Sequence, residues 1–255
     1  MISNNDSNGR PNTPLIDIAK TATACGVVFA VIVLAIAISA FALSSIFPSD
    51  IMEKVQNGAP PAIVVWTNLI IFQIAASVLI LAAVKLALPG QIHFIFALGP
   101  PRVPLSSIAF IFICVTAIHV IFSFLTFTFF PADVTADLDV FRDLMQRDIP
   151  FVLIFAVLVI GAPVCEELIF RGYLMNRLAE TRLGFGGATI VSTTGWTLLH
   201  AGYSTAGLME VFLAGLLFSW ALWKTGSLWV PILFHAIYNF SVLMYLISTS
   251  PTSAV

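Results

Sequence analysis

Seven long apolar stretches constrain the fold of this chain more than any other feature. A helix needs about 20 apolar residues to cross the hydrocarbon core of a bilayer. The stretches of that approximate length are residues 21–46, 61–88, 104–130, 151–178, 186–201, 206–224 and 228–248. Prolines separate most of them, as expected between helices. The segment 91–99 is apolar but too short to cross, and it is interfacial, re-entrant or an eighth span. We therefore predict an all-α, polytopic transmembrane helical bundle with seven to eight spans.

The composition supports a membrane protein and excludes a soluble one. Hydrophobic residues make up 59% of the chain and charged residues only 9%, with a mean hydropathy of +1.02. Soluble domains carry about 25% charged residues, and a soluble chain of this size cannot hide so much apolar surface. The net charge of −2 and the lack of a basic tract argue against nucleic acid as a partner. The expected partner is the lipid bilayer.

The chain divides into a few regions by composition. Residues 1–20 are a polar tail, 21–149 hold the first three spans and an acidic loop, and 249–255 are a short polar tail. The acidic loop, residues 132–149, has room for a short amphipathic helix. Residues 150–248 hold the remaining spans and form the C-terminal core. We read residue 21 onward as a retained first span, because the apolar run is too long for a signal peptide.

Lysine and arginine distribution predicts the orientation in the membrane. With a cytosolic N-terminus, eight basic residues lie inside: Arg10, Lys20, Lys85, Arg102, Arg171, Arg177, Arg182 and Lys224. Three lie outside: Lys54, Arg142 and Arg147. This bias predicts a multi-pass protein with its N-terminus in the cytosol. The small size of the chain favours a bacterial inner membrane over the endoplasmic reticulum.

A few ionisable residues fall inside the expected spans, where they are costly. They are His119, Glu166, Glu167, Arg171, His200, Glu210 and His235. A charged Asp, Lys or Arg at a helix centre costs about 2.5–3.5 kcal/mol on the translocon scale. Such residues are therefore paired with each other or used for function.

Two adjacent glutamates in the stretch "GAPVCEELIFRG" have different expected roles. Glu167 and Arg171 are four residues apart on a helix, with the acid first, which favours an ion pair. Glu166 is rotated by about 100° from Glu167 and faces another way. Glu166 therefore needs another partner or a function.

Two histidines and an asparagine are candidates to meet Glu166. Leu183, in a glycine-rich turn, lies 17 residues after Glu166 and 17 before His200, so these two side chains share a depth in a helical hairpin. His235 lies nearer to its own turn, and it meets them only if the first hairpin extends about 10 Å further into the cytosol. Asn239 lies one turn beyond His235 on the same face. We expect these four residues to converge from three helices.

Two further ionisable residues in the expected spans have no expected partners among the residues above. His119 is expected to be a packing residue. Glu210 lies near the outer end of its span, where its carboxylate is expected to reach the interface.

Three short motifs resemble the signatures of a known family. "EELIFR" (Glu166, Glu167, Arg171) is similar to EExxxR, "WTLLH" (Trp196 to His200) to FxxxH with tryptophan for phenylalanine, and "HAIYN" (His235 to Asn239) to HxxxN. Their order and spacing resemble the CPBP family, which comprises CAAX prenyl endopeptidases and bacteriocin-processing (Abi-like) proteins. The resemblance covers roughly residues 150–245.

The resemblance implies an intramembrane endopeptidase that acts on a membrane-associated peptide or protein, with prenylated CAAX proteins as one substrate class. It implies that Glu166 is the general base that activates water and that His200 helps to hold this water. His235 and Asn239 would stabilise the oxyanion, and Glu167 and Arg171 would maintain the geometry of the site.

Metal dependence is an open point, because the family also carries a metalloprotease label. Glu166, His200 and His235 are a possible zinc set of the two-histidine, one-glutamate kind. No HExxH motif is present to assemble two ligands on one helix. We favour a glutamate-activated water without a cofactor over zinc.

Two non-protease interpretations compete. A non-enzymatic immunity or scaffold protein would use the ion pair and histidines to stabilise the bundle or to contact a partner, but it has no need for Glu166, His200, His235 and Asn239 together. A proton-coupled transporter also buries glutamates and histidines. Transporters of this kind usually contain an inverted repeat, and we detect none.

Overall fold

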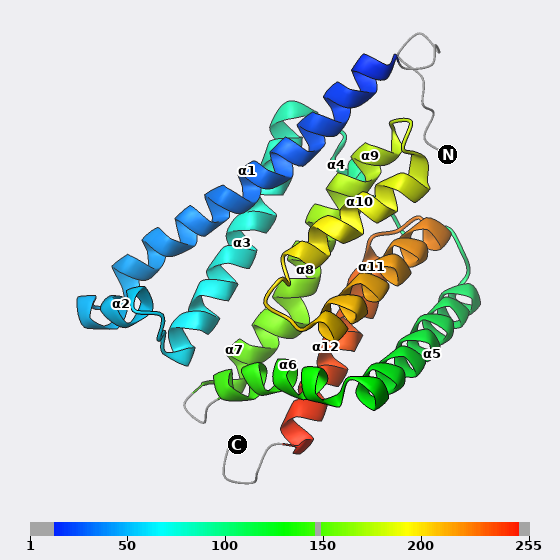
Figure 1. Ribbon diagram of the computed structural model, residues 1–255. Helices are drawn as coiled ribbons and strands as arrows, with labels where there is room; N and C mark the ends of the chain where they lie inside the picture. Colours follow the sequence, from blue (N-terminus) through cyan, green and yellow to red (C-terminus); the bar gives the residue numbers. More distant parts are fainter. Residues whose placement is uncertain (1–12, 146–148, 250–255) are drawn as a thin grey trace.

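The computed structural model describes residues 13–145 and 149–249, and all regular structure in this part of the chain is helical (Figure 1). The elements, in chain order, are α1 (Pro14–Ile46), α2 (Ser49–Gln56), α3 (Ala62–Ala87), α4 (Ile92–Ile95), α5 (Leu105–Phe129), α6 (Pro131–Leu144), α7 (Phe151–Phe155), η1 (Ala156–Gly161), α8 (Ala162–Glu166), η2 (Glu167–Met175), α9 (Asn176–Ala179), α10 (Gly184–Leu198), α11 (Thr205–Thr225) and α12 (Trp229–Thr249). Here η1 and η2 are π-helical segments, and α7 to α9 form one continuous helix with them.

Six helices of the described chain are long and apolar enough to cross a membrane. They are α1, α3, α5, the continuous helix Phe151–Ala179, α11 and α12. The predicted multi-pass helical bundle is therefore confirmed, but the predicted count of seven to eight spans is not. The expected span 186–201 corresponds to α10, whose 15 residues cover about 22 Å, less than the hydrocarbon thickness of about 30 Å. The segment 91–99 contains only the four-residue α4.

The first helix begins earlier than the sequence analysis predicted. The side-chain oxygen of Thr13 accepts a hydrogen bond from the Ile16 N–H at 3.4 Å, and Pro14 occupies the first turn, where proline is tolerated. Residues 14–20 of the expected polar tail are therefore helical. Residues 1–12, with Arg10, and residues 250–255 lie outside the described residues, as does Arg147.

The continuous helix Phe151–Ala179 is the centre of the bundle. Half of its most apolar stretch is buried, against 17% for α5. The helices α1 and α3 pack along each other on one side of it, whereas α10, α11 and α12 pack on the other side (Figure 1). The helix α5 lies at the edge next to α11. The charged motif therefore stands on the helix that is best shielded from lipid.

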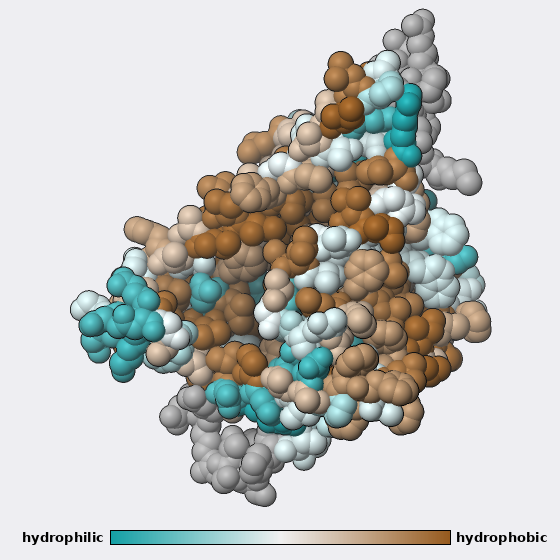
Figure 2. All heavy atoms as spheres, viewed as in Figure 1, coloured by the Kyte–Doolittle hydropathy of each residue, from teal (hydrophilic) through white to brown (hydrophobic). Residues whose placement is uncertain are grey.

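The surface of the molecule is that of a membrane protein. Figure 2 shows apolar side chains along α1 and across the bundle, with polar residues gathered at α2 and α6. The helix α6 forms from the acidic loop, in agreement with the predicted short helix. Large apolar side chains such as Phe29, Phe41, Phe110 and Phe124 are exposed, which is stable only when the surrounding solvent is lipid.

Candidate active site

The π-helical segments η1 and η2 lie on either side of α8, the short segment that ends at Glu166. A π-helical turn disturbs the regular i→i−4 bonding and often occurs at functional sites. Side-chain amides from neighbouring helices bond to the carbonyls of η1. The side-chain amide nitrogen of Gln73 (Nε2) donates to the Val157 carbonyl at 3.2 Å, and Asn239 Nδ2 donates to the Leu158 carbonyl at 2.8 Å. These two bonds stabilise the irregular backbone that precedes the glutamates.

The ion pair predicted from the EExxxR motif is present and fully buried. Arg171 Nη1 lies 3.1 Å from Glu167 Oε1, and neither side chain is exposed to solvent. A buried charge is costly unless it is paired. Each of these two residues therefore depends on the other for its place in the bundle.

Two aromatic rings and one glycine surround the guanidinium of Arg171. The guanidinium carbon lies 4.2 Å from the ring centre of Trp196 and 5.9 Å from that of Phe218, and such cation–π contacts strengthen when water is excluded. A Cβ atom at Gly215 would lie 2.8 Å from Arg171 Nη2. Glycine at this position leaves the space that the guanidinium occupies.

The imidazole of His235 lies between the two glutamates. Its Nδ1 is 3.1 Å from Glu167 Oε1 and its Nε2 is 3.9 Å from Glu166 Oε2. The ring is buried and stacks on Phe218 with 5.0 Å between ring centres. Because a carboxylate only accepts, Nδ1–H is the donor to Glu167, and Nε2 is directed toward Glu166. The predicted convergence of Glu166 and His235 is therefore seen.

The indole of Trp196 also holds Glu166. Its Nε1–H donates to Glu166 Oε2 at 2.6 Å. The sequence analysis treated this tryptophan only as an aromatic substitute for phenylalanine. A phenylalanine has no hydrogen-bond donor, so the substitution adds a contact to the glutamate. The one-residue difference from the family motif was the only sequence signal for this contact.

His200 is connected to Glu166 indirectly, because Trp196 contacts both residues. Its Nδ1–H donates to the Trp196 carbonyl at 3.1 Å, and its ring lies edge-on to the indole at 5.3 Å. In the described chain no hydrogen bond joins His200 to Glu166 or to His235. The bond at Nδ1 leaves Nε2 of the neutral ring free to accept a hydrogen bond from water. His200 lies in the turn after α10, because that helix ends at Leu198.

The turn that carries His200 is held by α6. Asp137 Oδ1 accepts from the Ser204 N–H at 2.8 Å, and Oδ2 accepts from the Ser204 hydroxyl at 2.7 Å. Ser204 in turn caps α11 by accepting from the Gly207 N–H at 3.1 Å. The acidic helix is thus joined to the start of α11, directly after the His200 turn. The sequence analysis did not single out Asp137, because its partner is 67 residues away.

Tyr203 lies in the same turn. Its ring packs against His200 at 5.3 Å and against Phe141 of α6 at 6.1 Å between ring centres. Burial raises the pKa of the Tyr203 phenol above its usual range, and the negative charges of Glu166 and Asp137 raise it further. The phenol therefore stays neutral at physiological pH.

Within the described residues, no hydrogen bond joins Asn239 to Glu166 or Glu167. The Asn239 side chain donates a hydrogen bond to the Leu158 carbonyl of η1. The amide nitrogen carries a second N–H, which that bond does not use. Asn239 is thus hydrogen-bonded to the backbone of the helix that carries Glu166.

A second polar cluster joins α5, α11 and α12. Glu210 accepts hydrogen bonds from the hydroxyls of Ser123, Thr126 and Tyr238. The carboxylate is half-buried, and the hydroxyl groups that bond it come from the neighbouring helices. The ring of His119 packs against Tyr238 at 4.5 Å, in agreement with a packing role.

The candidate zinc set does not fit a metal. In the described residues, no three His, Cys, Asp or Glu side chains are grouped closely enough to hold a metal ion. Glu166 and His235 approach each other, but His200 joins neither. Zinc needs each donor atom at about 2.0–2.2 Å. The metalloprotease interpretation is therefore not supported.

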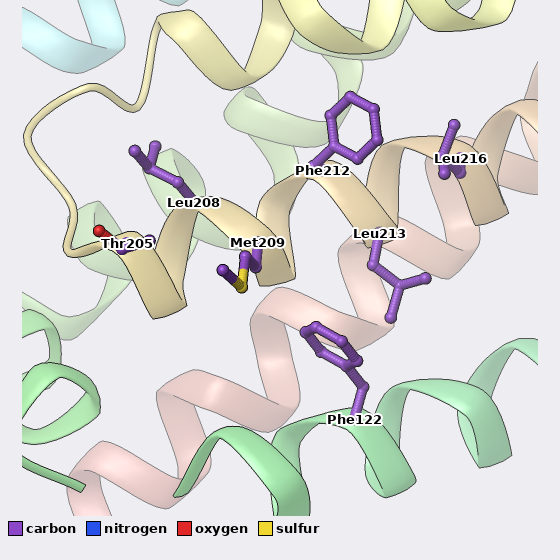
Figure 3. Close-up of a pocket in the computed structure, with 7 residues that line it drawn as sticks. All are labelled: Phe122, Thr205, Leu208, Met209, Phe212, Leu213 and Leu216. Atoms are coloured by element: carbon purple, nitrogen blue, oxygen red, sulfur yellow. The ribbon is translucent and has the colours of Figure 1, made fainter. Parts of the chain in front are cut away.

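The groove in Figure 3 lies away from these residues. It has a volume of about 410 Å³ and runs between α5 and α11, where Phe122 and Leu213 point toward each other. Its walls are Phe122, Thr205, Leu208, Met209, Phe212, Leu213 and Leu216. None of the motif residues lines it, so it is not the candidate active site.

Comparison with known proteins agrees with the three motifs. The family model described as type II CAAX prenyl endopeptidase Rce1-like matches residues 148–241. No curated protein and no solved structure matches the chain. The matched segment contains all three motifs and the residues that surround Glu166. The expected similarity to the CPBP proteins is thus confirmed over residues 148–241 of this multi-pass membrane protein.

Proposed function

We propose that the protein is an intramembrane endopeptidase that hydrolyses a peptide bond with a water molecule activated by Glu166. The observation that carries this proposal is the placement of His235 between Glu166 and Glu167, 3.9 Å and 3.1 Å from their carboxylate oxygens. The proposed general base and a fixed charge on the central helix are thus neighbours of a proposed oxyanion donor on α12. Peptide hydrolysis needs these groups together.

In this mechanism water is bound between Glu166 and the free Nε2 of His200. The glutamate takes one proton from the water as the oxygen attacks the carbonyl carbon of the peptide bond. Glu166 then passes this proton to the departing amine nitrogen as the carbon–nitrogen bond breaks. Glu166 thus gives back the proton that it took from water, and the reaction needs no redox partner.

The oxyanion of the tetrahedral intermediate requires hydrogen-bond donors. With both ring nitrogens protonated, His235 donates from Nε2 while Nδ1–H stays bonded to Glu167. Asn239 contributes its second amide N–H, the one that is not bonded to the Leu158 carbonyl. A preorganised donor of this kind contributes about 2.7–4 kcal/mol to stabilisation of the transition state.

The remaining residues keep these groups in place. Arg171 pairs with Glu167, and the same carboxylate oxygen of Glu167 holds Nδ1 of His235. Trp196 holds both Glu166, through its N–H, and His200, through its carbonyl. Activity is proposed to be independent of a metal, because the donors of the candidate zinc set do not gather.

The similarity to the Rce1-like family model favours a membrane-associated substrate. Prenylated CAAX proteins are the first substrate class to test. A cytosolic N-terminus is proposed from the charges. Six described basic residues belong to the inner side in that orientation: Lys20, Lys85, Arg102, Arg177, Arg182 and Lys224. Only Lys54 and Arg142 of the described residues belong to the outer side.

The test is hydrolysis of a farnesylated CAAX peptide by the purified full-length protein in liposomes. We expect hydrolysis that survives a zinc chelator and is much slower for the same peptide without the farnesyl group. Loss of activity with chelator that added zinc restores would overturn the metal-free mechanism. If no peptide is cleaved, membrane proteomes from cells with the wild-type protein and with Glu166→Ala should be compared. Identical proteomes would favour the non-enzymatic scaffold interpretation.

A further inference from the structure

A second groove lies between α1, α3 and the end of the helix Phe151–Ala179. Its volume is about 410 Å³. The polar part of its lining includes Lys20, Tyr173 and Arg177, and the apolar part includes Val27, Val84 and Leu88. None of the three motifs contributes a residue to this lining. The groove therefore has a chemistry of its own, apolar along most of its length and basic at one end.

Among the described residues, the basic end of the groove carries one charge without an ion-pair partner. Arg177 forms an ion pair with Glu180 at 2.6 Å. Nearby, Arg182 pairs with Asp17 at 3.2 Å. Lys20 lines the groove and is half-buried, and it makes no ion pair within the described residues. With the two pairs balanced, one positive charge remains at the mouth of the groove.

The groove lies at the level where lipid headgroups meet acyl chains. The 33 residues of α1 cover about 50 Å, well beyond the hydrocarbon core of about 30 Å. The uninterrupted apolar part of α1 starts at residue 21, so Lys20 marks the membrane boundary. Arg177 is near the last turn of its helix, and Leu88 directly follows α3. The apolar walls continue from this boundary toward the membrane interior.

We propose that this groove binds an anionic glycerophospholipid. The phosphate lies between Lys20 and Arg177, and one acyl chain packs along the apolar wall formed by α1 and α3. Basic pockets between transmembrane helices recognise anionic headgroups in this way. A zwitterionic lipid carries its own positive group, so it does not neutralise Lys20. The bound lipid joins the α1–α3 pair to the helix that carries the active site.

The test compares lipids that share the same acyl chains. Purified, delipidated full-length protein is titrated with phosphatidylglycerol and with phosphatidylcholine, and binding is measured by native mass spectrometry and by the shift in unfolding temperature. We expect tighter binding of phosphatidylglycerol. Lys20→Gln should weaken this binding about fivefold, the effect expected for one basic residue near a lipid surface. Equal binding of both lipids by the wild-type protein would overturn the proposal.

Two further variants separate the groove from general surface charge. Lys85→Gln removes the same charge at the end of α3, where the side chain is exposed and outside the groove lining, and it should leave binding unchanged. Ala83→Phe fills the groove without a change of charge and should abolish the preference for phosphatidylglycerol. Equal losses in Lys20→Gln and Lys85→Gln, or full binding by a folded Ala83→Phe, would contradict the proposal. Saturation by inorganic phosphate alone would likewise contradict a lipid site.

Discussion

The indole N–H of Trp196 donates a hydrogen bond of 2.6 Å to the carboxylate of Glu166. The same indole lies over the guanidinium of Arg171 at 4.2 Å. One side chain thus contacts both the proposed base and the cation that neutralises Glu167. The position of Glu166 therefore depends on a residue that belongs to the second motif.

Trp196→Phe should lower activity while the protein still folds. The phenyl ring keeps most of the packing on Arg171, but the hydrogen bond to Glu166 is lost, and bonds to charged groups contribute about 1.5–3 kcal/mol. We expect peptide cleavage to fall about tenfold or more in the liposome assay. Trp223→Phe, at an exposed position of α11, is the matched control and should have wild-type activity. Full activity of Trp196→Phe would show that the hydrogen bond does not hold the base.

Glu167→Ala and Arg171→Ala should each destabilise the fold. Either substitution leaves a fully buried charge without its partner, at a cost of about 3–5 kcal/mol. We expect lower yield and a lower unfolding temperature of the purified protein in detergent. Glu180→Ala removes the acid of the partly exposed pair with Arg177 and should cost about 1 kcal/mol or less. Equal unfolding temperatures for Glu167→Ala and Glu180→Ala would contradict the buried-pair account.

Gly215→Ala should destabilise the protein although alanine favours helices. A methyl group at this position would lie 2.8 Å from Arg171 Nη2 and 3.1 Å from a ring carbon of Trp196. Overpacking of this kind costs about 1–3 kcal/mol. Gly186→Ala has no atom within 4 Å of the added methyl group and should raise stability by up to about 1 kcal/mol. Thermal unfolding of the two variants checks the opposite signs, and a stabilising Gly215→Ala would refute the close packing.

Asp137→Ala should slow cleavage by loosening the turn that carries His200. The variant loses both hydrogen bonds between α6 and Ser204. We expect a fall in kcat of about tenfold with a small change in KM. Asp143→Ala, an exposed acid of the same helix, is the control for loss of negative charge. If both variants keep the wild-type kcat, α6 does not position the His200 turn.

The sequence predicted the membrane helices well, because apolar length alone decides them. It did not predict where α10 ends, because the apolar run to residue 201 was read as one span. That helix ends at Leu198, and the chain turns, with the Tyr203 N–H bonded to the His200 carbonyl at 2.9 Å. Hydropathy does not report such a turn, because the residues within it are also largely apolar.

Part of the candidate site was also predictable from the sequence. The spacing of Glu167 and Arg171 predicted their ion pair. Equal distances from the turn predicted a shared depth for Glu166 and His200, whereas the approach of His235 to Glu166 was predicted only if the first hairpin extended about 10 Å further into the cytosol. The contacts of Asp137 with Ser204 and of Asn239 with Leu158 were not predictable. They join segments 67 and 81 residues apart, and no periodicity or motif connects such segments.

The most direct test of the central claim is the rate of peptide cleavage by Glu166→Gln, measured in liposomes at equal amounts of folded protein. Glutamine keeps the size of the side chain and can still accept the bond from Trp196 through its oxygen, but it cannot take a proton from water. The account predicts a fall of at least about a thousandfold, within the range of general-base catalysis. A variant that cleaves within a few-fold of the wild-type rate would contradict Glu166 as the base.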